Sequence, residues 1–401
     1  MTSGQQVLPK PAVVAVAFAA VVLSHAVWPA SQWYIQPEAE VETLYDDNVR
    51  LTPEFAEESF AALVRARAAA GRRTETSDVF LAAEVDSRWY ADVADFDRTN
   101  GAFVFKGVQE AERSRFGLDA NFDYDSTRTS EEETTGLVQV DKRRSRFRVR
   151  PYWRYALTPR ADVNASASYE QVSYEDVDEI PLFDYSFVRG AMGLTYRMTE
   201  RLDVFSSLSY EDYEASDLDR SADSYGIIGG AEYALSPTLT VRAAAGARYS
   251  ETEVSVAGVV EEDDTTGPLF ELRVEKEFDL GRLVFSADRR LRPTGRGDLL
   301  DTTGLFMRLD YDLAPRLAFQ FTGRGYRNRQ SGGETSFSDR DFVRAEPRLA
   351  YRLGRNTELA VGYRLRYQDR EALGDSATSN AVFLTLRYDG RRQPLEDLLS
   401  F

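Results

Sequence analysis

Apolar and polar residues alternate with a period of two along most of the chain. In one segment the odd positions from 239 to 249 are Leu, Val, Ala, Ala, Ala and Tyr, while the even positions include Arg242 and Arg248. Such alternation predicts β-strands that have one apolar and one polar face. About 18 segments of this kind follow one another between residues 33 and 388, and we expect a total of 16 to 18 strands.

Six of these segments end in the same way, with an aromatic residue, any residue, Leu or Met, and then a short polar turn. The copies lie at residues 155–157, 196–198, 233–235, 278–280, 311–313 and 351–353. Roughly 40 residues separate successive copies, which is the length of two long strands, two turns and one longer loop. A β-propeller also repeats near 40 residues, but each of its blades needs four strands.

Short turns alternate with longer connections along the chain. Eight tight turns are expected near residues 71–76, 109–113, 157–160, 199–201, 236–238, 280–282, 314–316 and 354–356. This arrangement predicts an all-β fold, namely an antiparallel up-and-down transmembrane β-barrel whose short turns face the periplasm. Three prolines fall inside strand-like runs, where each removes a ladder hydrogen bond, and we expect bulges or strand ends at Pro37, Pro151 and Pro347.

The first 30 residues are typical of an export signal. Lys10 precedes an apolar run over residues 11–23, and a small-residue cleavage site follows at residues 24–26 or at Ala30. An uncleaved N-terminal anchor is the alternative interpretation of this segment. We therefore divide the chain into a signal and linker (1–30), an outer-membrane barrel (31–390) and a charged C-terminal tail (391–401), and we expect the protein in the cell outer membrane of a Gram-negative bacterium.

The composition of the chain argues against several kinds of catalytic and metal-binding site. The chain has no cysteine, and its one histidine, His25, lies in the signal segment. Without His or Cys, the mature chain lacks the residues of His-dependent triads, thiol nucleophiles and nearly all zinc and haem sites. We expect no enzyme activity, no cofactor and no metal site. The formal net charge of −17 argues against nucleic-acid binding, which requires a basic face.

Arginines occupy the polar face of several predicted strands. Five of them alternate with apolar residues in one segment: Arg144, Arg146, Arg148, Arg150 and Arg154. The same parity on other strands adds Arg242, Arg248, Arg308, Arg324, Arg348, Arg364 and Arg366 as candidates for the lumen lining. One interpretation is a lining that attracts anions or an acidic polysaccharide. The other is a structural network with Glu271, Glu275, Glu277, Asp288, Asp310, Asp312 and Glu346.

Acidic clusters are expected in the long connections, at residues 131–133, 175–179, 211–214 and 261–264. Carboxylate-rich loops at an outer surface can hold divalent cations and bridge to lipopolysaccharide phosphates, whereas solvated loop charge is the simpler interpretation. No spacing in these clusters matches a calcium-binding loop.

Three segments, together with the aromatic-turn repeat, resemble a family of outer-membrane barrels, the β-barrel porin-2 family. They are residues 45–52 (YDDNVRLT), 112–118 (ERSRFGL) and 135–144 (TGLVQVDKRR). The resemblance covers residues 33–388 and implies an association with exopolysaccharide or exosortase loci, but it supplies no catalytic residues. The C-terminus departs from the usual closing strand, so the insertion signal is either Phe401 or the segment 382–388.

Two classes of function are compatible with this sequence. The first is a porin-like channel for small anionic solutes, or a component of exopolysaccharide export. The second is a structural or anchoring barrel of the cell envelope without open-pore activity. The expected partners are outer-membrane lipid and lipopolysaccharide, together with polysaccharide or its export machinery, and no nucleic acid.

Overall fold

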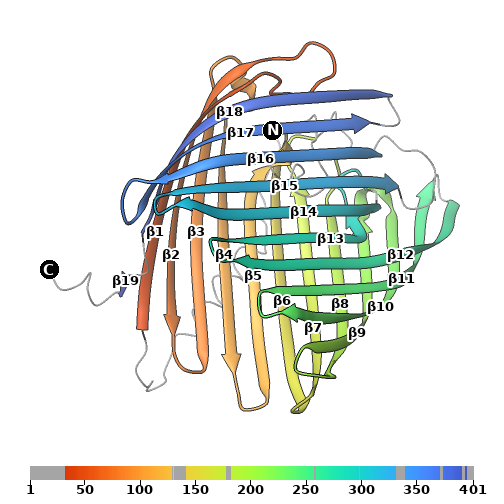
Figure 1. Ribbon diagram of the computed structural model, residues 1–401. Coiled ribbons are helices and arrows are strands. Elements are labelled where there is room, and N and C mark those ends of the chain that lie inside the picture. Colours follow the sequence, from red (N-terminus) through yellow and green to blue (C-terminus); the bar gives the residue numbers. More distant parts are fainter. Residues whose placement is uncertain are drawn as a thin grey trace, which may run out of the picture.

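The computed structural model describes residues 32–128, 130, 141–177, 182–256, 259–297, 299–330, 339–370, 374–390 and 393–394. Within these residues, eighteen strands of 13 to 20 residues form one antiparallel sheet (Figure 1). The first strand pairs with both the second and the eighteenth, so the sheet is a closed barrel. The predicted fold class and strand number are therefore confirmed. The segments that we assigned to the signal (1–30) and most of the tail (391–401), including Phe401, lie outside the described residues.

The strands follow the predicted segments closely. Their bounds are β1 Gln32–Asp46, β2 Ser59–Arg73, β3 Ser77–Tyr90, β4 Arg98–Glu110, β5 Ser114–Ser126, β6 Arg143–Thr158, β7 Ala161–Tyr174, β8 Tyr185–Arg197, β9 Leu202–Ala215, β10 Arg220–Ser236, β11 Leu239–Val256, β12 Val259–Phe278, β13 Gly281–Pro293, β14 Leu299–Ala314, β15 Leu317–Gln330, β16 Arg340–Arg352, β17 Thr357–Arg370 and β18 Asp375–Asp389. A two-residue strand β19 (Gln393–Pro394) also pairs with β1. Two short 3₁₀ helices, η1 (Ala94–Phe96) and η2 (Ser216–Leu218), lie in the longer connections. No helix among the described residues is long and apolar enough to cross a membrane.

All eight predicted tight turns join consecutive strands at one end of the barrel. The first residue of β1, Gln32, pairs with Arg73 beside the β2–β3 turn, so the chain enters the barrel at this short-turn end. β18 also ends there, at Asp389, which pairs with Glu38. The long connections therefore gather at the opposite end.

The outer face of the barrel is apolar. Met192, Leu208 and Ile227 expose 61%, 60% and 58% of their surface, which a protein in water would bury. Exposed tyrosines lie just before the short turns, for example Tyr233 and Tyr351. An apolar band between aromatic girdles on a closed barrel is the surface of a transmembrane barrel. The protein is located in the outer membrane.

The prolines correct one expectation from the sequence. Pro151 and Pro347 lie inside β6 and β16 and mark neither a bulge nor a strand end. Each keeps its pair on the preceding strand, but the pairs with the following strand are missing at the proline and at the residue before it. The register is unchanged beyond the gap, because a missing N–H removes hydrogen bonds without inserting a residue. Pro37 lies just outside the β1–β18 ladder, which begins at Glu38.

The close approach of β10 and β11 requires a glycine at one position in the barrel wall. A Cβ atom at Gly246 would lie 1.9 Å from the carbonyl oxygen of Ile227 on the adjacent strand, whereas a Cβ at Gly190 would meet nothing within 4 Å. We expect Gly246→Ala to lower the free energy of unfolding by about 1–3 kcal/mol, because backbone must shift to accommodate it. Gly190→Ala is the matched control. Urea unfolding in lipid vesicles measures both, and equal stability of the two variants would contradict the close approach.

Candidate functional site

The five arginines of β6 point to the inner face of the barrel, whereas the half-buried Phe147, Val149 and Trp153 have the opposite parity. Each forms an ion pair with an acid on β5 or β7. The pairs are Arg144–Asp125 (2.9 Å), Arg146–Asp123 (2.7 Å), Arg148–Glu170, Arg150–Asp119 (2.9 Å) and Arg154–Asp162 (2.5 Å). The β6 arginines are therefore part of an ion-pair network.

The acids that pair with the β6 arginines were missed at the sequence level. Asp119, Asp123 and Asp125 alternate along β5, the strand that precedes the arginine-rich strand. This period-two pattern was a usable signal, because consecutive strands of an up-and-down barrel are neighbours. The acids that we did name are distributed differently, with Glu275 pairing to Arg273 and Arg282 instead of to a candidate arginine.

The other seven candidates lie on five strands, β11 and β14 to β17, so the structure does not gather the twelve arginines into one site. Their contacts are Arg242–Glu271 (3.0 Å), Arg248–Asp301 (3.1 Å), Arg308–Asp310 (2.7 Å), Arg348–Glu358 (3.9 Å), Arg364–Glu346, Arg366–Asp46 (2.6 Å), and Arg324 over the Phe306 ring at 5.8 Å. Three of the predicted partners, Glu271, Asp310 and Glu346, pair with candidate arginines as expected.

The acidic clusters are placed differently from our expectation. Residues 211–214 lie on β9 and residues 261–264 lie on β12, so these two clusters belong to strands and not to loops. The pairing of β11 with β12 continues from Glu251–Asp264 to Val256–Val259, whereas β13 pairs with β12 only from Phe270 onwards, so β12 extends past β13 (Figure 1). The cluster at 131–133 lies outside the described residues. In the described part of the chain, no group of three acidic side chains is arranged to hold a metal ion.

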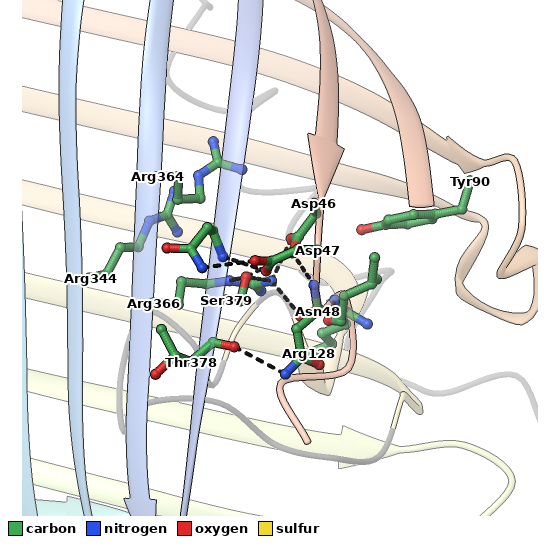
Figure 2. Close-up of polar contacts among 12 residues, drawn as sticks. Asp46, Asp47, Asn48, Tyr90, Arg128, Arg344, Arg364, Arg366, Thr378 and Ser379 are labelled. Carbon is green, nitrogen blue, oxygen red and sulfur yellow. Dashed lines mark hydrogen bonds and ion pairs between the residues drawn. The ribbon is translucent and has the colours of Figure 1, made fainter. Parts of the chain in front are cut away.

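The first long connection, residues 47–58, folds into the mouth of the barrel. Val49 and Leu51 are completely buried, and Leu51 packs against Phe342 and Ala377. The Asn48 amide nitrogen donates to the backbone oxygen of Thr378 at 3.0 Å (Figure 2). This connection, which we call the inward loop, therefore lies against the inner wall near β16 and β18.

A buried polar network holds the base of the inward loop (Figure 2). Asp46 accepts hydrogen bonds from Arg366 Nη2 at 2.6 Å, from Ser379 Oγ at 2.7 Å and from the backbone N–H of Asn48 at 3.0 Å. The next residue, Asp47, accepts from the backbone and the side chain of Asn380 at 2.6 and 2.8 Å. These contacts join the end of β1 to β17 and β18, where the barrel closes.

The inward loop also reaches the connections that follow β3 and β5. Arg128 donates to the backbone oxygen of Val49, and its guanidinium lies 4.1 Å from the centroid of the Phe96 ring. Arg50 lies 4.3 Å from the same centroid. Hydrogen bonds to Glu57 and Asp95 raise the pKa of the Arg50 guanidinium above its usual value. The inward loop is thus fixed on both sides.

A second group of side chains narrows the mouth from the other side. This apolar cluster links residues of β7 to β10 with residues of β13 and β14, two groups of strands that are not adjacent in the sheet. Its members are Val172, Tyr174, Leu182, Tyr185, Tyr213, Ala215, Ala222, Leu291 and Leu299. The backbone N–H of Phe183 donates to the oxygen of Gly295 at 2.6 Å, which links the β7–β8 and β13–β14 connections. Phe187 of β8 packs against this cluster as well, so an apolar side chain lies on the inward face of that strand.

A cavity with a lining of mixed charge lies at the short-turn end. It has a volume of about 640 Å³ and is lined by residues of β1 to β5 and the β2–β3 turn, including Tyr34, Phe80, Arg67, Lys106 and Arg115. The acids Asp78 and Glu110 share this lining. Charged groups of both signs therefore lie at the short-turn end as well as along the strands.

No family model matches this chain. A comparison with curated proteins also finds no match. The resemblance to the β-barrel porin-2 family and its exopolysaccharide association therefore rests on the residues alone.

Solved structures with a similar fold include the following two proteins. OccAB3 of Acinetobacter baumannii is 11% identical, with a TM-score of 0.44 over 89% of this chain and 98% of that chain. OccK2 (OpdF) of Pseudomonas aeruginosa is 13% identical, with a TM-score of 0.45 over 90% and 99%, and it also has a structure in complex with glucuronate. A likeness at this level assigns no function to the present chain.

Proposed function

We propose that the protein is a porin-like channel that lets small solutes cross the outer membrane, with a preference for anions. An antiparallel barrel of 18 strands is wide enough to enclose an aqueous passage. Its inner face is charged along its length, whereas its outer face is apolar. A charged inner wall is costly to bury and is compatible with water in the lumen.

The observation that carries the anion preference is the unequal exposure of the paired charges. Arg150 exposes 56% of its side chain while its partner Asp119 exposes 19%, and Arg154 exposes 55% against 18% for Asp162. The same order holds for Arg148 and Glu170. The guanidinium groups therefore extend further into the lumen than the carboxylates, so a passing solute meets positive charge first.

This preference can be measured as a reversal potential in planar bilayers under a KCl gradient. We expect the wild-type protein to favour chloride, and Arg148→Gln/Arg150→Gln/Arg154→Gln to shift the reversal potential towards potassium, because three carboxylates lose their partners. Arg72→Gln is the control, because this arginine stacks on Trp33 at the outer face and the variant changes charge outside the lumen. A triple variant with the wild-type reversal potential would refute the proposed lining.

A structural or anchoring barrel without open-pore activity is the second candidate. The inward loop and the apolar cluster, which narrow the mouth from two sides, favour it. Absence of single-channel conductance both in the wild-type protein and in a variant that lacks the inward loop would support this candidate and exclude the first. Export of exopolysaccharide is a narrower proposal that rests on the family resemblance. Unchanged polymer secretion in a deletion strain would exclude it.

We also propose outer-membrane lipid and lipopolysaccharide as partners of the outer face. One row of acids crosses four adjacent strands in direct register, namely Asp212, Asp223, Glu251 and Asp264. A row of tyrosines lies two residues along the first three of these strands, at Tyr210, Tyr225 and Tyr249. Tyrosines of this kind are typical of the membrane interface, so the acids are expected at the level of lipid headgroups.

A further inference from the structure

A row of directly paired residues crosses the inner wall near the short-turn end. It passes over β1 to β5 through Tyr34, Gly71, Phe80, Lys106 and Asp119. Tyr34, Phe80 and Lys106 belong to the lining of the cavity of about 640 Å³ at this end of the barrel. The row therefore supplies this cavity with two aromatic rings and one cation.

The glycine of this row gives the cavity an apolar side. A Cβ atom at Gly71 would lie 2.8 Å from Cε1 of Tyr34, so the Tyr34 ring occupies the space of the missing side chain. The ring thus extends from β1 across β2, towards the strand that carries the half-buried Phe80. Val108, two residues beyond Lys106 on β4, adds a further apolar group to the lining.

Lys106 is the cation beside these rings, and it has no partner within the protein. It is exposed, and it forms no ion pair or side-chain hydrogen bond with any residue that the structure describes. Asp119 pairs with it directly across the strands, but the Asp119 carboxylate accepts from Nη2 of Arg150 at 2.9 Å. The acid beside Lys106 is therefore bound to a different cation.

The other charged groups in the strands that line the cavity are paired with one another or with acids further along the wall. The pairs are Arg73–Asp78 (2.8 Å), Arg115–Glu110 (3.7 Å) and Arg67–Glu38 (3.1 Å). The remaining acid of the lining, Glu75, belongs to the β2–β3 turn and not to the strands. Lys106 is thus the cation of this lining whose charge is available to a ligand.

An available ammonium group beside aromatic rings suits a ligand with two different parts. The ammonium group can donate charge-assisted hydrogen bonds to an anionic group, whereas the rings favour a flat apolar body. Small-molecule sites occupy about 300–1,000 Å³ and combine apolar walls with few polar groups. The volume of about 640 Å³ lies within this range, so the cavity has room for such a ligand.

We propose that the cavity at the short-turn end binds a small organic anion with a flat apolar ring. Lys106 holds the anionic group, and the ring lies against Phe80 and Tyr34. The inference deepens the proposed channel function and rests on it for its role in transport, because it names a class of solute for the lumen.

Binding is measured on the full chain in detergent, from the line broadening of the fluorine NMR signal of 4-fluorobenzoate. Two further probes separate the parts of the ligand: 4-fluorobenzylamine keeps the ring with the opposite charge, and acetate keeps the charge without the ring. We expect saturable binding of 4-fluorobenzoate, weak binding of the amine, and weak competition by acetate. Equal binding of the amine and the benzoate would overturn the proposal.

Variants of the cavity test the two contacts separately. We expect Lys106→Gln to weaken the binding of 4-fluorobenzoate by about tenfold or more, because the bond to a charged donor is lost. Phe80→Leu keeps an apolar side chain but removes the flat ring, and should weaken binding by about threefold. Lys276→Gln is the matched control, because Lys276 lies on β12 outside this lining and bonds to Thr238 at 2.9 Å. Binding by Lys106→Gln at the wild-type affinity would contradict the site.

The outcome for the site can be told apart from the outcome for the channel. A barrel that prefers chloride in planar bilayers but does not bind 4-fluorobenzoate would refute the inference and leave the proposed function in place. A barrel that binds 4-fluorobenzoate through Lys106 but conducts no current would refute the channel and leave the site.

Discussion

Arg366→Met is expected to destabilise the folded barrel by about 3–5 kcal/mol, because removal of one partner leaves a buried charge without compensation. The Arg366 and Asp46 side chains are 5% and 6% exposed, and the pair lies where β1 meets β18. Arg366 also donates to Ser379 and to the backbone oxygen of Asn48, so the variant loses several hydrogen bonds. The measurement is unfolding of the refolded protein in lipid vesicles by urea.

Arg352→Met provides the matched control for this prediction. Arg352 pairs with Asp312 at 3.1 Å at the short-turn end, where both side chains are about half exposed. Exposed pairs contribute about 0–1 kcal/mol, so this variant should remain close to the wild-type stability. The double variant Asp46→Leu/Arg366→Met should recover part of the loss, because it removes both buried charges. An equal loss of stability in Arg366→Met and Arg352→Met would show that the Arg366–Asp46 pair, which lies where β1 meets β18, has no special role.

Replacement of residues 50–57 by a short Gly-Ser linker is expected to raise the single-channel conductance by about twofold or more, because the constriction in the mouth widens. The replaced segment includes Leu51, which is buried against Phe342, and Arg50, which contacts Phe96. Asp46 and Asn48 are kept, so their contacts with β17 and β18 at the base of the loop remain. Planar-bilayer recordings of the wild type and the variant measure the change.

A deletion in the hairpin formed by β11 and β12 is the control, because it tests whether shortening any long connection changes the conductance. Replacing residues 254–261 by Asn-Gly shortens the β11–β12 hairpin at the end where β12 extends past β13. We expect this variant to conduct like the wild type. If the wild type does not conduct but the inward-loop variant does, the loop is a plug. If neither conducts, the channel proposal fails and the anchoring barrel is favoured.

The barrel itself was accessible from the sequence because its signals are local. Alternation fixes the outer and inner faces of a strand such as β11, and the aromatic-turn repeat at residues 233–235 marks its boundary. The sequence predicted that the arginines of β6 could form ion pairs, but it did not identify the acids that are their partners. Their acids lie on β5, in a pattern that we did not use, and on β7, where Asp162 and Glu170 lie far apart and form no repeat.

The inward loop and the apolar cluster, which narrow the mouth of the barrel, could not be predicted from the sequence in this way. The bond from Asn48 to Thr378 joins residues 330 positions apart, and no local pattern announces it. The apolar cluster consists of residues such as Tyr185 and Tyr213, which occupy inward positions where the strand pattern predicts polar groups. Strand periodicity reports which face a residue occupies, but it does not report what lies opposite across the lumen.

The seam between β1 and β18 has a consequence for how the barrel is made. Each of the other neighbouring long strands is adjacent in the sequence, so those hairpins form from short stretches of chain. Ser379 and Asp46, in contrast, are 333 positions apart. Contacts of such separation form slowly, and until they form, β1 and β18 present open edges that attract other strands. Closure is therefore the step at which an unfinished chain is most exposed to aggregation, and Asp46 and Arg366 can meet only once the last strands have been synthesised.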